Sequence, residues 1–519
     1  MKTSIFLVRI AFAGALAFAG VTAAADMSSG KGNDPAAYEP IIPDGVGGND
    51  YDYDPAFAAG GVSLDRFAGA PGYYQGLRMT RLTNGANVSA GLVVIDGAYQ
   101  LGIVRYSSSG RRETRSAVDA PYSRYNGQYI VFPNSPASDP KISYVSEIKS
   151  YGGKLFVLAT QMYRASNGLD KYQPVIIAFT EDGHNLGWWF IRIDDDVHNE
   201  AIAMDITSNG RMTMLAANSG GGLYTRYWTA RYKIGSDGVP VLDTGFGNGG
   251  ASMFELASTV SSCPAALGGH CPISGVDLKH EGSLVLLVDP SFYVAFTKKY
   301  DDNGDHDPCI ASFNGSGQLR TSFNGTGVRC YPFDDTGSNH DDEAVALRGD
   351  FHTEFSGGML RNVQDIYLLA TVARQFSPGH GLMRVDSASN PVAQFGGTGK
   401  IVWGGCGSGC TFNIGAETPI AFARQGNLLG IVGHWKPQLV DQPLLSIVDA
   451  YAGTVLNFET HALASGDANY NDVIGDPLGF TATGWARDGA ADSSNRMFVT
   501  SHLIPARVAD DTIFRYGLE

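Results

Sequence analysis

The hydrophobic residues of this chain gather in short runs, and turn-forming residues separate the runs. Residues 154–159 (KLFVLA) and 283–288 (SLVLLV) are two examples, each of strand length and each preceded by a glycine. Apolar stripes with a helical period are hard to find, so the pattern predicts buried strands joined by tight turns. The 66 glycines among 519 residues agree with this, because average proteins contain roughly 7% glycine. We therefore expect an all-β protein.

Glycines recur ahead of these runs in a way that indicates a repeat. Each stands second in a turn pair, where a tight hairpin needs a positive φ; the positions are Gly97, Gly153, Gly210, Gly282 and Gly426. The wide gap after Gly282 leaves room for a divergent copy, of which the run at 365–369 is the remnant. A second divergent copy falls near 476–480. About seven copies result, with periods of about 50 to 75 residues that fit four-stranded blades.

Two further signals fix the order within each copy. A phenylalanine followed four residues later by glycine occurs at Phe57, Phe246, Phe323 and Phe395, and an Arg-Tyr pair ends a run at Arg105, Arg231 and Arg515. The last copy stops just after its Arg-Tyr pair, whereas the Phe57 segment stands alone ahead of the first copy. A β-propeller closed by its N-terminal strand explains this order and hides both terminal sheet faces. An open β-solenoid or two β-sandwiches are the alternatives. We expect the phenylalanines to pack between blades.

The copy that ends at Gly250 also carries a family resemblance. Its order of Asn-Gly, strand, Arg-Tyr strand and the segment LDTGFGNGG at 242–250 resembles the delta-60 repeat, a propeller-forming motif of exported bacterial proteins. The resemblance implies a propeller of about seven blades over residues 54–519 and an envelope or extracellular setting. It implies no general activity and no fixed catalytic residues. The acidic residue ahead of the phenylalanine is replaced at Gln394 and around 320–322, so we expect irregular blades there.

The N-terminal segment has the features of an export signal. Lys2 and Arg9 precede an apolar stretch, and small residues follow at 23–25, which is the order of a cleaved signal peptide over residues 1–25. Residues 26–53 are rich in glycine, proline and acidic residues, and we interpret them as a flexible acidic leader, with an interaction tail as the alternative. No later run approaches the ~18 apolar residues of a membrane span. The sequence predicts a periplasmic or extracellular protein without a membrane span.

All six cysteines lie after this segment. An even number of cysteines in an exported chain favours disulfides. Proximity suggests three pairs, although zinc ligation is the competing interpretation; the pairs are Cys263 with Cys271, Cys309 with Cys330, and Cys406 with Cys410.

The charge balance excludes one class of partner. The formal net charge is −15, whereas binding to nucleic acid or to an anionic membrane needs clustered positive charge. We expect a monomer whose unknown ligand is a polysaccharide or an envelope component.

One acidic segment follows part of a calcium pattern. Oxygen-bearing side chains alternate there as the first ligands of a calcium loop do; they are Asp301, Asn303, Asp305 and Asp307. The sixth position is His306 in place of glycine, and the twelfth is Ser312 in place of glutamate. The segment predicts either a Ca²⁺ site or a solvated acidic turn, and no other cofactor is indicated.

Two acidic clusters with histidine are candidates for chemistry. His198 with Glu200, and His340 with Asp342, stand just before predicted innermost strands. Histidine beside a carboxylate can act as a general base or a metal ligand. Exposed acidic loops are the simpler interpretation.

Familiar catalytic motifs are missing from the sequence, including His-Glu-x-x-His and Gly-x-Ser-x-Gly. The leading hypothesis is therefore a binding or surface-interaction module that acts through its loop face. The alternative is a carbohydrate-active enzyme, a lyase or hydrolase at the mouth of the central channel. The aromatic segments 187–190 and 224–228 would stack on sugar rings in that case, or pack inside the blades.

Overall fold

The computed structural model describes residues 52–53, 62–65, 73–95, 98–111, 113, 128–131, 138–164, 170–191, 198–220, 224–254, 283–286, 291–299, 306–333, 342–356, 359–373, 378–404, 416–436, 441–460, 467–476, 479–487 and 496–504. Within these ranges the chain forms 30 strands and no helix. No helix in this part of the chain could therefore cross a membrane.

The strands form seven antiparallel sheets, numbered here in chain order. Sheet 1 contains β3 (Tyr74–Arg81), β4 (Asn87–Ile95), β5 (Ala98–Tyr106) and β6 (Gln128–Val131). Sheet 2 contains β7 (Ser138–Tyr151), β8 (Lys154–Arg164), β9 (Asp170–Thr180) and β10 (Asn185–Phe190). Sheet 3 contains β11 (His198–Ile206), β12 (Arg211–Gly220), β13 (Tyr224–Ile234), β14 (Pro240–Leu242) and β15 (Ala251–Phe254). Sheet 4 contains β16 (Ser283–Leu286), β17 (Phe292–Lys299), β18 (His306–Phe313) and β19 (Val328–Cys330).

The remaining sheets follow the same plan. Sheet 5 contains β20 (Glu343–Ser356), β21 (Met359–Val372), β22 (Gly379–Asp386) and β23 (Lys400–Trp403). Sheet 6 contains β24 (Ala416–Gln425), β25 (Leu428–Lys436), β26 (Gln442–Asp449) and β27 (Val455–Thr460). Sheet 7 contains β28 (Ala468–Asp476), β29 (Gly479–Arg487), β30 (Arg496–Ile504), β1 (Asp52–Tyr53) and β2 (Val62–Asp65).

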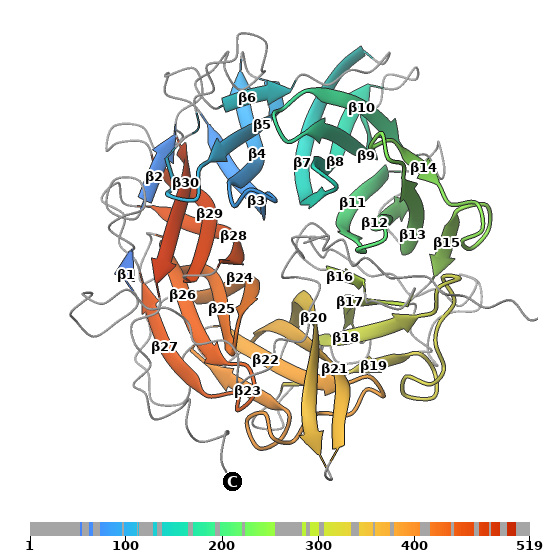
Figure 1. Ribbon diagram of the computed structural model, residues 1–519, viewed down its shortest axis with the longest axis vertical. Coiled ribbons are helices and arrows are strands. Elements are labelled where there is room, and N and C mark those ends of the chain that lie inside the picture. The colour runs from blue at the N-terminus through green and yellow to red at the C-terminus, as the bar shows by residue number, and fades with distance from the viewer. Residues whose placement is uncertain are drawn as a thin grey trace, which may run out of the picture.

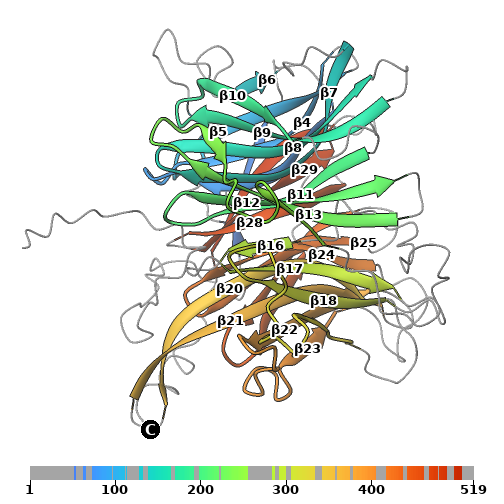
Figure 2. The ribbon, with the colours of Figure 1, turned by 90° about the vertical axis from the view of Figure 1, so that its right-hand side faces the viewer.

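The sheets stand side by side around a common axis (Figure 1). The first strand of each of sheets 1 to 6, and β28 of sheet 7, lies nearest the axis. Each of these innermost strands contacts the next, from β3 through β7, β11, β16, β20, β24 and β28 back to β3. Figure 2 shows the ring from its side, with the long β20–β21 hairpin reaching past the other strands of sheet 5. The predicted all-β fold and its propeller arrangement are confirmed.

Strands from the two ends of the chain meet in sheet 7. Both β1 and β2 pair antiparallel with β30, and Leu64 is the register partner of Val499. Two predicted landmarks, Phe57 and Arg515, lie outside the described residues.

The predicted hairpin glycines that the structure describes do occupy turns between first and second strands. Gly153, Gly210 and Gly426 have φ values of 74°, 78° and 55°, a region that residues with a Cβ seldom adopt. Gly97 and Gly282 lie outside the described residues.

The phenylalanine motif forms the same turn in three consecutive sheets. Phe246, Phe323 and Phe395 are fully buried. The carbonyl of each accepts a hydrogen bond from the amide of the glycine four residues later, at 2.8, 2.7 and 2.7 Å. Each ring belongs to a hydrophobic cluster that it shares with the following sheet, as predicted.

The arginine of the Arg-Tyr pair joins neighbouring sheets. Arg105 on β5 donates to the carbonyl of Glu181, in the outer turn of sheet 2. Arg231 on β13 donates to Gly315, in the outer turn of sheet 4. Each guanidinium also has a carboxylate partner within its own sheet, Glu113 at 2.7 Å for Arg105 and Asp243 at 2.9 Å for Arg231. The motif therefore fastens one sheet to the next.

The aromatic segments also pack within the fold. Trp188 and Phe190, on β10, pack against the core between sheets 1 and 2, and Trp189 packs against the core of sheets 2 and 3. On β13, Tyr227 and Trp228 are each only 1% exposed. Of the two roles predicted for these segments, packing within the blades is the one that the structure shows.

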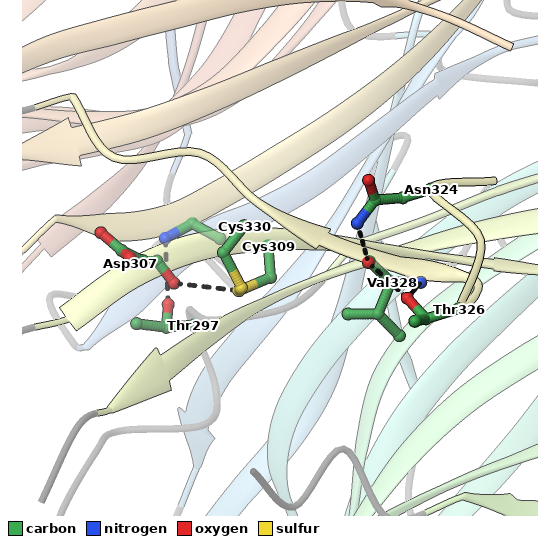
Figure 3. The surroundings of a disulfide bond; sticks show 8 residues. Thr297, Asp307, Cys309, Asn324, Thr326, Val328 and Cys330 are labelled. Carbon is green, nitrogen blue, oxygen red and sulfur yellow. Dashed lines mark hydrogen bonds between the residues drawn. A yellow bond between two sulfur atoms is a disulfide. The ribbon is translucent and has the colours of Figure 1, made fainter. Parts of the chain in front are cut away.

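A disulfide links β18 to β19 in sheet 4. Cys309 and Cys330 are direct register partners and form the bond shown in Figure 3. This confirms one of the three predicted pairs. The other four cysteines lie outside the described residues.

Candidate functional site

The innermost strands share a local irregularity. In six of them the register with the second strand shifts by one residue at an equivalent place. One residue of the innermost strand is therefore left without a register partner at each shift. Such a β-bulge bends the strand and re-aims the next side chain. The residues that directly follow the bulge are Arg78, Glu147, Ala203, Ala346, Ala421 and Asp472.

These equivalent positions divide the ring into two unlike parts. Asp472, Arg78 and Glu147 stand on the adjacent strands β28, β3 and β7, whereas the three positions elsewhere in the ring are alanines. Two residues further along their strands, Lys149 and Asp205 add charges on β7 and β11. We call Arg78, Glu147, Lys149, Asp205 and Asp472 the axial charge cluster. It occupies one side of the ring only.

Arg78 joins three innermost strands. Its Nε donates to the carbonyl of Ser146 on β7 at 2.7 Å, and its NH1 donates to the carbonyls of Leu77 at 2.8 Å and Asn471 on β28 at 3.3 Å. A guanidinium has five N–H donors in a fixed plane. The guanidinium is therefore fixed between its own strand and both neighbours.

The carboxylates of the cluster are held by backbone amides. Asp472 accepts from the amide of Met79 on β3 at 2.8 Å and from the amide of Val473 at 2.9 Å. Glu147 and Asp205 each accept from the amide of the following residue, at 3.1 and 3.0 Å. The carboxylate positions are therefore set by the strands themselves.

Lys149 brings two of these carboxylates together. Its Nζ lies 3.9 Å from Oε1 of Glu147 and 3.8 Å from Oδ1 of Asp205. Two oxygens that both lie within 4 Å of one nitrogen are less than about 8 Å apart, so Glu147 and Asp205 can act on one small ligand. The Glu147 side chain is 20% exposed and that of Asp205 is 14% exposed, so solvent reaches both.

Burial changes the protonation of the cluster. Burial raises the pKa of Glu147 to about 7, and Asp472 and Asp205 raise it further against the opposing effects of Lys149 and Arg78. Burial also raises the pKa of Asp472, although Arg78 and two backbone amides oppose it. The Arg78 pKa is raised because the nearby Tyr144, Asp472 and Glu147 together outweigh burial. Glu147 can therefore hold or release a proton near neutral pH.

Hydrogen bonds between innermost strands support the cluster on both sides. The Ser146 hydroxyl donates to the carbonyl of Ala201 on β11 at 2.8 Å. The Asn471 amide donates to the carbonyl of Gly76 on β3 at 2.6 Å. Ser146 and Asn471 are the unpaired residues of their bulges, and each joins its strand to the next innermost strand of the ring.

The structure separates the candidates that the sequence suggested. Glu200 lies on β11 and Asp342 directly before β20, and sheet 4 stands between these two strands. Asp342 is fully buried, and its carboxylate accepts from the amides of Phe333 at 2.8 Å and Ala373 at 3.3 Å. These bonds give Asp342 a structural role. The His198 side chain and the whole of His340 lie outside the described residues.

Of the four suggested calcium ligands, only Asp307 lies within the described residues. Asp307 lies on β18 and is buried, whereas Asp301, Asn303 and Asp305 lie outside the described residues. Within the described ranges, no group of three or more His, Cys, Asp or Glu residues could hold a metal ion. The calcium site stays a prediction.

The axial charge cluster was missed at the sequence level, although a signal existed. Each member interrupts an apolar strand, as in LRM at 77–79, SEIK at 146–149 and MDI at 204–206. A single charge inside a strand of this kind usually has a buried partner or a functional role. Only the ring places these charges on neighbouring strands.

Comparisons with known proteins assign no function to the chain. No family model and no curated protein matches it. Among solved structures, it resembles a protein of unknown function from Dyadobacter fermentans DSM 18053, at 10% identity over 72% of this chain and 97% of that one, with a TM-score of 0.37. It also resembles the α-L-arabinofuranosidase Arb93A of Fusarium graminearum, at 7% identity over 77% and 96%, with a TM-score of 0.37.

A third resemblance is to the β-propeller domain of the Trilobed protease from Pyrococcus furiosus, at 11% identity over 73% of this chain and 100% of that one, with a TM-score of 0.31. Likenesses at this level of identity and TM-score transfer no activity to this chain.

Proposed function

We propose that the protein is an exported binding module, a seven-bladed propeller of the delta-60 repeat type, which holds a polar ligand at the axial charge cluster. Two observations support seven blades in a closed ring. The seven innermost strands contact one another in an unbroken circle, and β1 and β2 from the start of the chain pair with β30 near its end. The N-terminal strands then complete the last blade.

The uneven distribution of charge is the observation that supports binding at the axis. A residue needed only to build the ring would recur at equivalent positions of every blade, because the blades repeat one plan. Here charged residues follow the bulge on three adjacent strands and alanines follow it on three others. Buried charge lowers stability unless it is well paired. Buried charge also occurs on β20 and β24, as in the ion pair of Asp350 with Arg424, but directly after the bulge it is confined to three adjacent strands. This local difference favours a ligand site.

A saccharide fits the chemistry of this cluster. Its hydroxyl groups both donate and accept hydrogen bonds, so they match carboxylates beside an arginine and a lysine. The cluster holds both positive and negative side chains, and the hydroxyl groups at the end of a polysaccharide would hydrogen-bond to both. The proposed ligand is therefore the end of a polysaccharide chain, either free or in the cell envelope.

Calorimetry with a panel of oligosaccharides tests this proposal. Asp205→Asn should weaken binding at least about tenfold, because loss of one charged hydrogen-bond partner costs about 1.5–3 kcal/mol. The matched control is Asp170→Asn, since Asp170 is exposed and its ion-pair partner among the described residues is the exposed Arg164. Equal affinities for the wild type, D205N and D170N would contradict the proposal, as would no binding to any member of the panel.

Hydrolysis of a glycosidic bond is the second candidate function, and the pairing of Glu147 with Asp205 favours it. The protonated Glu147 would give its proton to the glycosidic oxygen as the bond to the anomeric carbon breaks. The Asp205 carboxylate would take a proton from the water whose oxygen forms the new bond to that carbon. New reducing ends from the same panel, abolished in Glu147→Gln while binding persists, would support catalysis. Binding without new reducing ends would support the binding module and contradict hydrolysis.

A further inference from the structure

Sheets 5 and 6 enclose a histidine that has no hydrogen-bond partner among the described residues. His380 on β22 is fully buried. Its ring lies 5.1 Å from that of Trp403 and 6.0 Å from that of Phe458 on β27. Neither ring nitrogen has a hydrogen-bond partner within the described part of the chain. A buried imidazole in such surroundings is stable only in its neutral form.

A second histidine approaches from sheet 6. His434 lies on β25, and its Nδ1 also has no partner among the described residues. Burial lowers the pKa of His380 to about 3, and the neighbouring His434 lowers it further. Burial and Lys436 lower the pKa of His434, while Asp441 raises it. Glu417 on β24 is the other charged group facing this region, and its carboxylate fills the space beside Gly404.

The seam between sheets 5 and 6 is fastened unequally along its length. Near His380, the bonds across it include one from Nε1 of Trp403 to the hydroxyl of Ser446 at 3.2 Å and one from the amide of Glu417 to the carbonyl of Pro378 at 3.4 Å, and both are long.

The other end of the seam is closed more firmly. Arg384, four residues after His380 on β22, is held by Asp365 at 2.7 Å and reaches the carbonyl of Tyr451 in sheet 6. The Tyr367 hydroxyl donates to the carbonyl of Ala450 at 2.8 Å. The amide of Gly396 donates to Ala452 at 2.8 Å.

We propose that His380 and His434 form an acid-sensitive latch, at which the seam between sheets 5 and 6 opens in mildly acidic conditions while the Arg384 end stays closed. In the closed seam both rings are neutral. His380 is fully buried in the closed seam and His434 is half-buried. In the open seam water surrounds both rings, and each can take a proton at its ordinary pKa of about 6.5. Acid therefore favours the open form, because only that form binds the protons.

Linkage sets the size of the effect. Below pH 6.5 the opening equilibrium should rise by about tenfold per pH unit for one histidine, until the pH approaches the pKa of the closed form. Between pH 7 and pH 5 the rise is about 30-fold with one histidine taking part, and larger with both.

Hydrogen exchange followed by mass spectrometry tests the latch, with rates corrected for the intrinsic effect of pH. In the wild type, protection of peptides covering β22 and β25 should fall by about 30-fold or more from pH 7 to pH 5. Protection of β8 in sheet 2, which carries no histidine, should not fall over the same range. His380→Phe should remove most of the fall, because phenylalanine suits the aromatic surroundings and cannot take a proton.

Two further variants complete the test. His434→Gln should reduce the fall in the same peptides, and His184→Gln should leave it unchanged, since His184 is exposed in the turn after β9. A wild-type protein in which β22, β25 and β8 keep parallel protection between pH 7 and pH 5 would overturn the latch, even if H380F failed to fold. An equal fall in the wild type, H434Q and a folded H380F would overturn it as well.

Discussion

Replacement of Phe246 by alanine tests how the repeat motif holds the ring together. The Phe246 ring is fully buried and lies 6.1 Å from the Phe292 ring of sheet 4. The Arg231 guanidinium stands 4.5 Å from the ring centroid. The ring therefore closes the space between sheets 3 and 4, and the same arginine fastens those sheets on its other side.

The expected loss is large for a single residue. Truncation of a buried phenylalanine to alanine costs about 3 to 5 kcal/mol, from the lost transfer of the ring and from the cavity left behind. The loss of the aromatic and cation–π contacts is part of that total. Phe246→Leu keeps most of the volume, so it should cost less than about 1.5 kcal/mol.

Urea titrations monitored by tryptophan fluorescence measure both effects. Wild type, F246L and F246A should unfold in that order of decreasing midpoint, with similar slopes. A loss of stability below about 1 kcal/mol for F246A would refute the packing role, because removal of a fully buried and well-packed ring costs more than that. An F246L variant as unstable as F246A would refute the estimate based on volume.

Three other predictions follow from the described contacts. The pKa of Glu147 is raised to about 7, so its protonated form should stabilise the folded protein below pH 4.5, and this contribution should be lost as the pH rises through 7. Urea titrations at pH 5 and pH 8 should show the free energy of unfolding falling by up to about 3 kcal/mol, a fall that E147Q lacks. Replacing both Cys309 and Cys330 by serine should lower stability by about 3 kcal/mol, because the disulfide spans 21 residues, as thermal melts would show. Asp342→Asn should cost about 1 to 3 kcal/mol in the same melts, since an amide cannot accept both backbone bonds equally well.

The repeat could be predicted because its signals are local. A hairpin glycine at Gly210 and a buried Phe246 follow from turn geometry and burial, which involve residues close in sequence. Arg384 was not identified as a further copy of the Arg-Tyr signal, because valine follows it where tyrosine follows Arg231. Both arginines nevertheless bond to a turn in a neighbouring sheet.

The candidate site could not be predicted because its parts are distant along the chain. Arg78 and Asn471 are joined by a hydrogen bond across the meeting of sheets 1 and 7, and no local pattern records that neighbourhood. Glu200 and Asp342, which the sequence suggested in two separate clusters, show the converse. Glu200 lies within β11 and Asp342 directly before β20, sheet 4 stands between them, and backbone amides bind the Asp342 carboxylate.

The pairing of β2 with β30 also constrains the order in which the molecule assembles. Its partner residues are separated by more than four hundred positions, so this contact has nearly the largest loop-closure cost that the chain can impose. More than four hundred residues must be synthesised after β2 before β30 can pair with it. Until β30 emerges, β1 and β2 lack the strand that they pair with, and unpaired strand edges promote aggregation of β proteins. Chain termination shortly before Arg496 would leave these early strands without their partner.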